Sequence, residues 1–196
     1  MSEANRPPKL ILASRSPRRR QLLAEAGYRF EVCPPREDIE SAEPSESRDP
    51  AELVARLAYR KAEDVARRIS SGLILGCDTV AECDGRILGK PQDRADARRM
   101  LETLRGRRHR VLSGLCLWKQ PDGAHLIRVE ATTLLMDRLT DAAVEEYLAG
   151  GAWREKAGAF GYQDRLGWVR IVEGSESNVV GLPMELLDEM LRQIAP

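Results

Sequence analysis

The sequence predicts an α/β fold built on a mixed sheet, and three observations support this prediction. Apolar runs of strand length alternate along the chain with segments whose apolar residues recur at helical spacing. Two long strand-like runs, 110–118 and 126–137, are separated by the turn residues 121–123, so we expect them to be antiparallel. The run 73–77 is apolar throughout, which is typical of a buried central strand. An α+β arrangement is the alternative that this order of elements leaves open.

The first elements are a strand, a capped helix and a second strand. The apolar run 10–13 predicts the first strand. Ser16 and Pro17 then predict a helix start, because serine caps helix N-termini and proline suits the first helical position. We expect this helix to end at Gly27. A short apolar run at 30–33 predicts the second strand.

A long amphipathic helix and a β-hairpin follow. A loop rich in proline, serine and glutamate precedes Pro50, which opens a helix with apolar residues at helical spacing. We expect Gly72 to end that helix. The Asp-Gly pair at 84–85 is a hairpin signal, so we expect 80–83 and 86–88 to pair.

The C-terminal half adds three helices and a strand to the two antiparallel strands. Asp93 and Thr140 are expected to cap helices that end near residues 104 and 149, and Pro183 opens a last amphipathic helix. Glycines cluster between these elements, and 168–173 predicts a strand.

The composition is that of a globular protein with balanced charge. The chain has 196 residues, with 31 lysines and arginines against 31 aspartates and glutamates, whereas nucleic-acid binders usually have a basic excess. No apolar run approaches the length of a membrane span, and we see no signal-peptide pattern. We therefore expect neither a nucleic-acid partner nor a membrane. We expect residues 1–8 to form a disordered tail and residues 9–196 to fold as a single domain.

Cysteines and histidines limit the chemistry further. The four cysteines form no CxxC pair, so in a chain without an export signal we expect reduced thiols and a cytoplasmic location. With only two histidines, the sequence gives little support to a zinc site or a Ser-His-Asp triad.

The strongest indication of a ligand is the run of arginines that follows the first strand. Arg18, Arg19 and Arg20 fall in the first turn of the predicted helix, where the helix dipole disfavours cations by about 0.3–1 kcal/mol each. Such a violation of a local rule is typical of a functional site. Free N–H groups and clustered guanidinium groups together favour an anion, and we expect a polyphosphate. The alternative is a solvated face that pairs with acids elsewhere.

Acidic residues occur in two places that suggest metal or water chemistry. Asp78 and Thr79 follow the apolar run 73–77, at what we expect to be the carboxyl end of a strand, where open α/β sheets bind ligands. A carboxylate there is suited to holding a metal ion or activating water, with a turn aspartate as the alternative. Residues 37–52 hold seven acids, which form either a metal-binding wall opposite the arginines or a solvated loop.

Three further polar residues are weaker candidates. Lys90 lies between glycine and proline, which constrains its backbone. Lys61 lies at the edge of the apolar stripe of its helix, where a solvated face is the alternative. Gln163 ends a glycine-rich stretch, and its amide can both donate to and accept from a base edge, although such a stretch can also be a surface loop.

Together these stretches resemble the Maf family of nucleotide pyrophosphatases. They occur in the family's order, from residue 10 to the last helix. The matching stretches are Leu12-Ala13-Ser14-x-Ser16-Pro17-Arg18-Arg19, Arg56-Leu57-Ala58-x-x-Lys61-Ala62, Gly76-x-Asp78-Thr79, Gly89-Lys90-Pro91, Lys156-Ala157-Gly158-Ala159-Phe160-Gly161-x-Gln163 and Val179-x-Gly181-Leu182-Pro183.

The resemblance implies a mixed twisted sheet with flanking helices and two lobes around a central cleft, as in the inosine-triphosphate pyrophosphatases. It implies hydrolysis of a nucleoside triphosphate to the monophosphate and pyrophosphate, assisted by Mg²⁺ or Mn²⁺. Arg18, Thr79 and Gln163 resemble the branch of the family that acts on dTTP and UTP, whereas another branch acts on 7-methyl-GTP.

The resemblance also implies roles for individual residues. Asp78 would be the catalytic residue and, with Glu40, would hold the metal, although Glu37 or Asp38 could take the place of Glu40. The residues that would bind the substrate are Ser14, Ser16, Arg18, Arg19, Lys61, Thr79, Lys90 and Gln163.

Two other functions stay open at this point. One is a house-cleaning pyrophosphatase for modified nucleotides, and the other is a non-catalytic regulator of septum formation, to which the family's older name refers. A homodimer is one assembly that the sequence allows.

Overall fold

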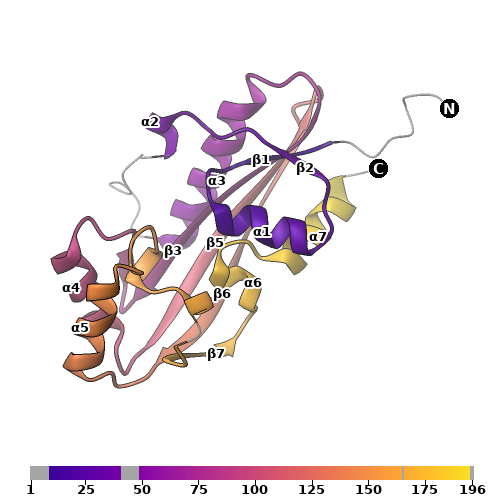
Figure 1. Cartoon of the computed structure of the whole chain (residues 1–196). Helices are drawn as coiled ribbons and strands as arrows, with labels where there is room; N and C mark the ends of the chain where they lie inside the picture. Colours follow the sequence, from indigo (N-terminus) through magenta and orange to yellow (C-terminus); the bar gives the residue numbers. More distant parts are fainter. Residues whose placement is uncertain (1–8, 41–48, 165, 195–196) are drawn as a thin grey trace.

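The computed structural model describes residues 9–40, 49–164 and 166–194, apart from the side chains of Asp38, Glu40 and Gln163. The expected tail at 1–8 and the acidic stretch 41–48 therefore lie outside the described residues. Within them, helices flank a seven-stranded mixed sheet, which confirms the predicted fold class (Figure 1).

Strands and helices follow one another much as the sequence predicts. The elements are β1 (Leu10–Ala13), α1 (Pro17–Glu25), β2 (Phe30–Val32), α2 (Glu37–Glu40), α3 (Pro50–Ala66), β3 (Gly72–Cys83), β4 (Arg86–Leu88), α4 (Arg94–Leu104), β5 (Arg108–Gln120), β6 (His125–Met136), α5 (Asp141–Gly150), the 3₁₀ turns η2 (Ala157–Ala159) and η3 (Tyr162–Asp164), β7 (Val169–Glu173), α6 (Glu176–Val180) and α7 (Met184–Ile194).

The sheet has a parallel part and an antiparallel part. The strand order is β2-β1-β3-β5-β6-β7, with β4 paired to β3 off this path. β1 is parallel to β2 and to β3, whereas β5 is antiparallel to β3 and to β6, and β7 is antiparallel to β6. The expected antiparallel pair β5–β6 and the expected hairpin β3–β4 are both confirmed.

One edge of β3 is left open in its middle. β1 pairs with β3 only as far as Ala13 opposite Gly76, and β4 takes up the same edge from Leu88 opposite Ala81. Between these points, no strand in the described part of the chain pairs with residues 77–80 on that edge. The opposite edge is paired with β5 along its length.

The expected end of β3 after Cys77 is wrong. β3 is one strand of 12 residues, so Asp78 and Thr79 lie in its middle. Asp78 and Thr79 interrupt the apolar run because they lie where one edge of β3 is open. Pairing with β5 on the opposite edge keeps their backbone extended. The site is instead placed by the end of β1, the parallel neighbour.

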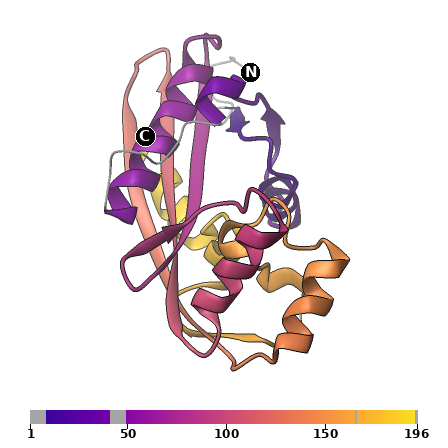
Figure 2. The same cartoon turned by 90° about the vertical axis from the view of Figure 1, so that its left-hand side faces the viewer.

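Helices cover the two faces of the sheet unequally. On one face, Ile74 of β3 packs against Ala58 and Ala62 of α3. The other face carries two separate cores, one around α1 and α7 and one around α4 and α5 (Figures 1 and 2). Because β3 passes beneath both cores, the two lobes share one sheet.

Two glycines let α3 lie directly on the strands. A Cβ atom at Gly76 would lie 2.1 Å from the Ala58 carbonyl oxygen, and one at Gly114 would lie 2.3 Å from the Val54 carbonyl oxygen. Any larger residue would push the helix away. The close approach fixes the height of α3 above β3.

Short elements and one helix end differ from expectation. α3 ends at Ala66, and Gly72 begins β3 instead of ending the helix. α2 lies in the stretch before Pro50 that is expected to be a loop, and α6 lies in a stretch where no helix is expected, because helices of four or five residues are too short to show a periodic pattern. Within the described residues, no helix has the length and apolar character needed to cross a membrane.

Candidate functional site

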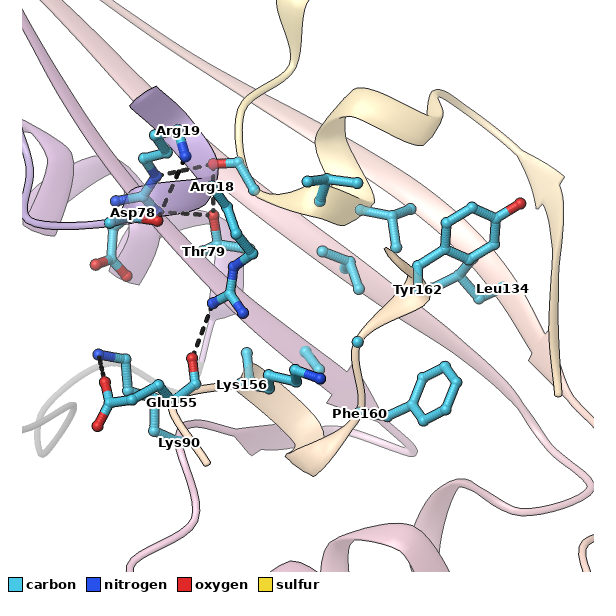
Figure 3. A pocket seen from close by; sticks show the side chains of 18 of the residues that line it. Arg18, Arg19, Asp78, Thr79, Lys90, Leu134, Glu155, Lys156, Phe160 and Tyr162 are labelled. Carbon is cyan, nitrogen blue, oxygen red and sulfur yellow. Dashed lines mark hydrogen bonds and ion pairs between the residues drawn. The ribbon is translucent and has the colours of Figure 1, made fainter. Parts of the chain in front are cut away.

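A cavity of about 400 Å³ lies at the open edge of β3 (Figure 3). Its lining changes character from one side to the other. Figure 3 shows Arg18, Arg19 and Asp78 on one side, with Leu134, Phe160 and Tyr162 on the other. The charged residues in its wall are Arg15, Arg18, Arg19, Lys61, Asp78, Lys90, Glu155 and Lys156, and apolar residues include Ala81, Leu104, Val111, Leu134, Phe160, Val169 and Val179.

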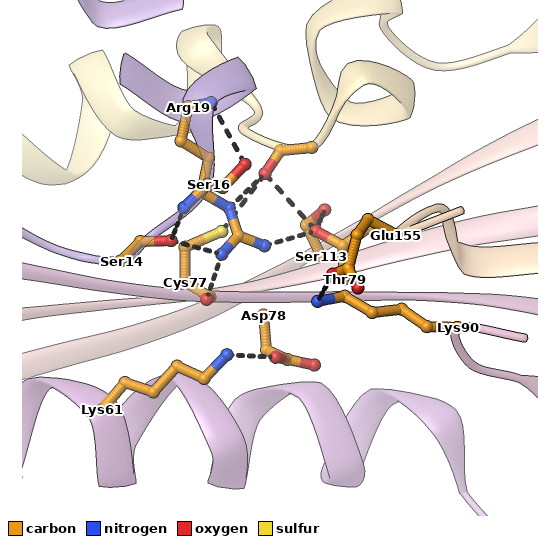
Figure 4. Close-up of polar contacts among 11 residues, drawn as sticks. Ser14, Ser16, Arg19, Lys61, Cys77, Asp78, Thr79, Lys90, Ser113 and Glu155 are labelled. Atoms are coloured by element: carbon orange, nitrogen blue, oxygen red, sulfur yellow. Dashed lines mark hydrogen bonds and ion pairs between the residues drawn. The ribbon is translucent and has the colours of Figure 1, made fainter. Parts of the chain in front are cut away.

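Arg19 is a buried cation held by neutral groups. Its guanidinium donates to the carbonyl oxygens of Cys77 at 2.8 Å and Gly181 at 2.9 Å, and to the Ser14 and Thr79 hydroxyls at 3.0 and 3.1 Å (Figure 4). No described carboxylate forms an ion pair with it. These bonds occupy four of its five N–H donors, so Arg19 offers a ligand its charge more than its hydrogen bonds.

Arg18 and Arg20, the neighbours of Arg19, lie in different surroundings. Arg18 is half-buried in the cavity wall, and its Nη2 donates to the Glu155 carbonyl oxygen at 2.8 Å. Burial lowers the pKa of Arg18, and the charge of Arg19 lowers it further. Arg20 is exposed and is not part of the cavity wall. Two of the three arginines, Arg18 and Arg19, therefore line the cavity.

Lys61 and Asp78 form a shielded ion pair across the α3–β3 contact. Lys61 Nζ donates to Asp78 Oδ1 at 2.7 Å, and the two side chains are 4% and 15% exposed. Gly76 lies against Ala58 and Ala62, so the glycine approach brings Lys61 down to the sheet. This burial excludes the solvated face that was the alternative for Lys61.

Glu155 engages two of the cavity's cations at once. Its carboxylate lies 2.7 Å from Lys90 Nζ, and its backbone carbonyl accepts from Arg18. Both side chains of the pair are well exposed. Lys90, with Arg18, lowers the pKa of Glu155. The backbone φ of Glu155 is +60°, which is unusual for a residue with a side chain. Nothing in the sequence pattern indicated a role for Glu155.

The hydroxyl groups expected in the site form its framework. Ser14 is fully buried, and its Oγ accepts from the Ser16 amide at 3.2 Å as well as from Arg19. Ser16 caps α1, as predicted. Thr79 Oγ1 lies 2.8 Å from Ser113 Oγ. Ser16 and Thr79 line the cavity, whereas Ser14 does not and instead accepts a hydrogen bond from Arg19.

A buried polar cluster holds the segment around η2 and η3. Lys156 Nζ lies 2.6 Å from Asp164 Oδ1, and the Tyr147 hydroxyl donates to the same carboxylate at 3.0 Å. Burial, with help from Asp164, raises the pKa of Tyr147. Asp164 therefore ties this segment to α5 beside the apolar side of the cavity. The side chain of Gln163, the expected base reader, lies outside the described part of the segment.

The expected metal site has one described ligand. Asp78 lines the cavity, while the side chains of Asp38 and Glu40 lie outside the described residues, and Glu37 pairs with Arg15. Among the described side chains, no three His, Cys, Asp or Glu residues gather as a metal site. Mg²⁺ is commonly held by one or two carboxylates together with substrate phosphates, so a single Asp78 in a cavity lined by cations fits that ion.

Comparison with known proteins identifies the family of this chain. The family model described as Maf-like protein matches residues 9–194. The chain belongs to the Maf family. It is 53% identical over 186 residues to a protein named dTTP/UTP pyrophosphatase from Rhodopirellula baltica, covering 94% of this chain and 82% of that protein. A protein of the same name from Ruminiclostridium cellulolyticum is 40% identical over 187 residues, covering 94% and 95% of the two chains.

Solved structures show that this Maf protein shares its fold with more distant proteins. The Ham1 protein of Staphylococcus aureus has a TM-score of 0.53 at 13% identity and covers 94% of this chain and 98% of its own. A HAM1 protein from Coxiella burnetii has a TM-score of 0.51 at 14% identity and covers 95% and 99%. At such low identity the likeness concerns the fold alone.

Proposed function

We propose that this Maf protein hydrolyses dTTP and UTP to the nucleoside monophosphate and pyrophosphate. The observation that carries the proposal is the buried Arg19, which has no ion-pair partner among the described carboxylates and lines the same cavity as Asp78. A buried cation of this kind favours an anionic ligand, and the apolar side of the same cavity suits a nucleobase. The printed names of the relatives support the choice of nucleotides.

The cations of the cavity bind and orient the triphosphate. The half-buried Arg18 and the exposed Lys90 contact phosphate oxygens, while the buried Arg19 supplies positive charge. Their charges are fixed before the reaction, so they stabilise the charge that grows on the leaving pyrophosphate without reorganising.

Asp78 acts on the attacking water. Its carboxylate, held by Lys61, accepts a proton as the water oxygen bonds to the α-phosphorus, and the bond between that phosphorus and the bridging oxygen to the β-phosphate breaks. The electron pair leaves with pyrophosphate. Asp78 would also hold Mg²⁺ or Mn²⁺, and when bound the ion neutralises phosphate charge. The acid expected to share the metal, Glu40, remains part of the proposal.

The experiment is product analysis with a panel of nucleotides. Purified protein with Mg²⁺ is incubated with dTTP, UTP, CTP, GTP and 7-methyl-GTP, and the products are identified by phosphorus NMR. We expect pyrophosphate from dTTP and UTP, with turnover abolished by excess chelator. Orthophosphate as the first product, or full turnover in chelator, would contradict the proposal.

A cytoplasmic location belongs to the same proposal. All four cysteines are free thiols, and three of them are buried. Unpaired thiols are typical of a reducing compartment.

A further inference from the structure

His109 lies on the part of β5 that lines the cavity. Side chains alternate along a strand, so Ser113, Val111 and His109 face the same side of the sheet, and both Val111 and His109 line the cavity. Ser113 contacts Thr79 next to the arginines. Four residues of strand then place His109 about 13 Å from Ser113, towards the apolar side.

The surroundings of His109 favour the tautomer that carries its proton on Nδ1. Nδ1 lies 3.4 Å from the Arg107 carbonyl oxygen, which can only accept, so Nδ1 is the donor. The side chain is buried, and burial lowers the pKa of His109 below its usual value of 6.5. A neutral ring protonated at Nδ1 leaves a lone pair on Nε2. Among the described residues, no donor bonds to that nitrogen.

We propose that Nε2 of His109 accepts a hydrogen bond from the N3–H group of a bound uracil or thymine. The inference rests on the proposed function and deepens it by assigning a residue that selects the base. His109 is one of the few polar groups on the apolar side of the cavity, where its neighbours include Leu104, Val111 and Leu134. In such surroundings a single hydrogen-bond acceptor discriminates strongly between ligands.

The chemistry of the base edges explains the direction of this selection. Uracil and thymine present a carbonyl, an N–H and a second carbonyl, so their central group donates to Nε2. Cytosine presents an acceptor nitrogen at the central position, which would face the lone pair of Nε2 and leave both groups without a proton between them. A buried group that is left without its hydrogen-bond partner weakens binding.

The test is a binding measurement that needs no turnover. The affinities of α,β-imido-UTP, its N3-methyl derivative and inorganic triphosphate are measured by calorimetry in the presence of Mg²⁺. The proteins are wild type, His109→Leu, which removes the acceptor, and His109→Gln, which keeps one in its amide oxygen. His125→Leu is the matched control, because His125 stacks on Trp118 and does not line the cavity.

We expect wild type to bind α,β-imido-UTP at least tenfold more tightly than the N3-methyl derivative. His109→Leu should remove this difference while its affinity for inorganic triphosphate changes less than twofold, and His109→Gln should restore part of it. Equal affinity of wild type for the two nucleotide analogues would overturn the inference. So would a His109→Leu variant that loses affinity for inorganic triphosphate to the same degree, since that result indicates a structural role.

Two features keep the outcomes distinct. If His109→Leu does not fold, the wild-type ratio and the Gln variant still decide the question. Turnover of UTP by wild type is measured separately by release of pyrophosphate. Its absence would contradict the proposed function, while the binding ratio continues to test the role of His109.

Discussion

Lys61 Nζ on α3 lies 2.7 Å from Asp78 Oδ1 on β3, and neither side chain is more than 15% exposed. A pair shielded in this way depends on both partners, because removing one leaves a poorly solvated charge. The pair therefore connects the proposed catalysis with stability at the point where α3 meets the open edge of β3.

Asp78→Asn should abolish most turnover and cost some stability. The amide keeps the shape and one acceptor oxygen, but it cannot take a proton from water and no longer neutralises Lys61. We expect kcat to fall at least a hundredfold, or about 2.7 kcal/mol in the activation barrier, together with a lower Tm. Glu102→Gln is the control, because Glu102 pairs with Arg98 on the surface. Retention of kcat within tenfold would show that Asp78 is not the catalytic residue.

The neighbouring arginines should respond differently to substitution. Arg18→Ala removes a cation from the positive end of α1, so we expect weaker turnover with an unchanged or slightly higher Tm. Arg19→Lys breaks several of the four bonds that join Ser14, Cys77, Thr79 and Gly181, so both Tm and activity should fall. Arg20→Ala controls for the loss of charge at the same helix end. A clear loss of Tm in Arg18→Ala would indicate a structural ion pair instead.

Glu155→Gln should lower the KM for dTTP. The Glu155 carboxylate holds Lys90, and a phosphate oxygen must take its place for that lysine to bind substrate. Exposed ion pairs are weak and screened by salt, so we expect KM to fall a few-fold at low ionic strength and the effect to fade at high salt. Lys90→Gln, in contrast, should raise KM. An unchanged KM for Glu155→Gln at low salt would show that the pair does not compete with substrate.

Mild acid should destabilise the fold through His109. The pKa of His109 is lowered by burial in the folded state, so the unfolded chain binds a proton at a higher pH than the native chain does. The contribution of His109 to the free energy of unfolding should be constant at pH values above 6.5, the usual pKa, and should decline below that pH. The carboxylates with lowered pKa values, such as Asp64 and Asp141, contribute only in stronger acid. Thermal unfolding from pH 8 to pH 5 measures this, and His109→Gln should flatten the curve. The same slope in that variant would assign the effect to another group.

Local signals made much of the fold predictable. Ser16, Asp93 and Thr140 cap helices as expected, because a cap depends on residues within one turn. The antiparallel pair β5–β6 follows from a short turn between two apolar runs. These elements, with the Maf motifs, were enough to predict a mixed sheet.

The site was only partly predictable because its contacts are not local. The burial of Lys61 depends on how closely α3 approaches Gly76 and Gly114, which no spacing within the helix reveals. Asp78 follows an apolar run whether the strand ends there or continues. Glu155 is 65 positions beyond Lys90 in the chain, and its contact with that lysine exists only once the fold has formed.

Arg19 takes the place of a missing length of β-strand. A longer β1 would have supplied backbone amide donors to residues 77–80 of β3. The guanidinium of Arg19, from α1, instead donates a hydrogen bond to the Cys77 carbonyl oxygen. A peptide segment there would complete the ladder but bring no net charge. The side chain supplies both the hydrogen bond and a positive charge, so extending β1 along residues 77–80 would complete the sheet and close the proposed anion site at the same time.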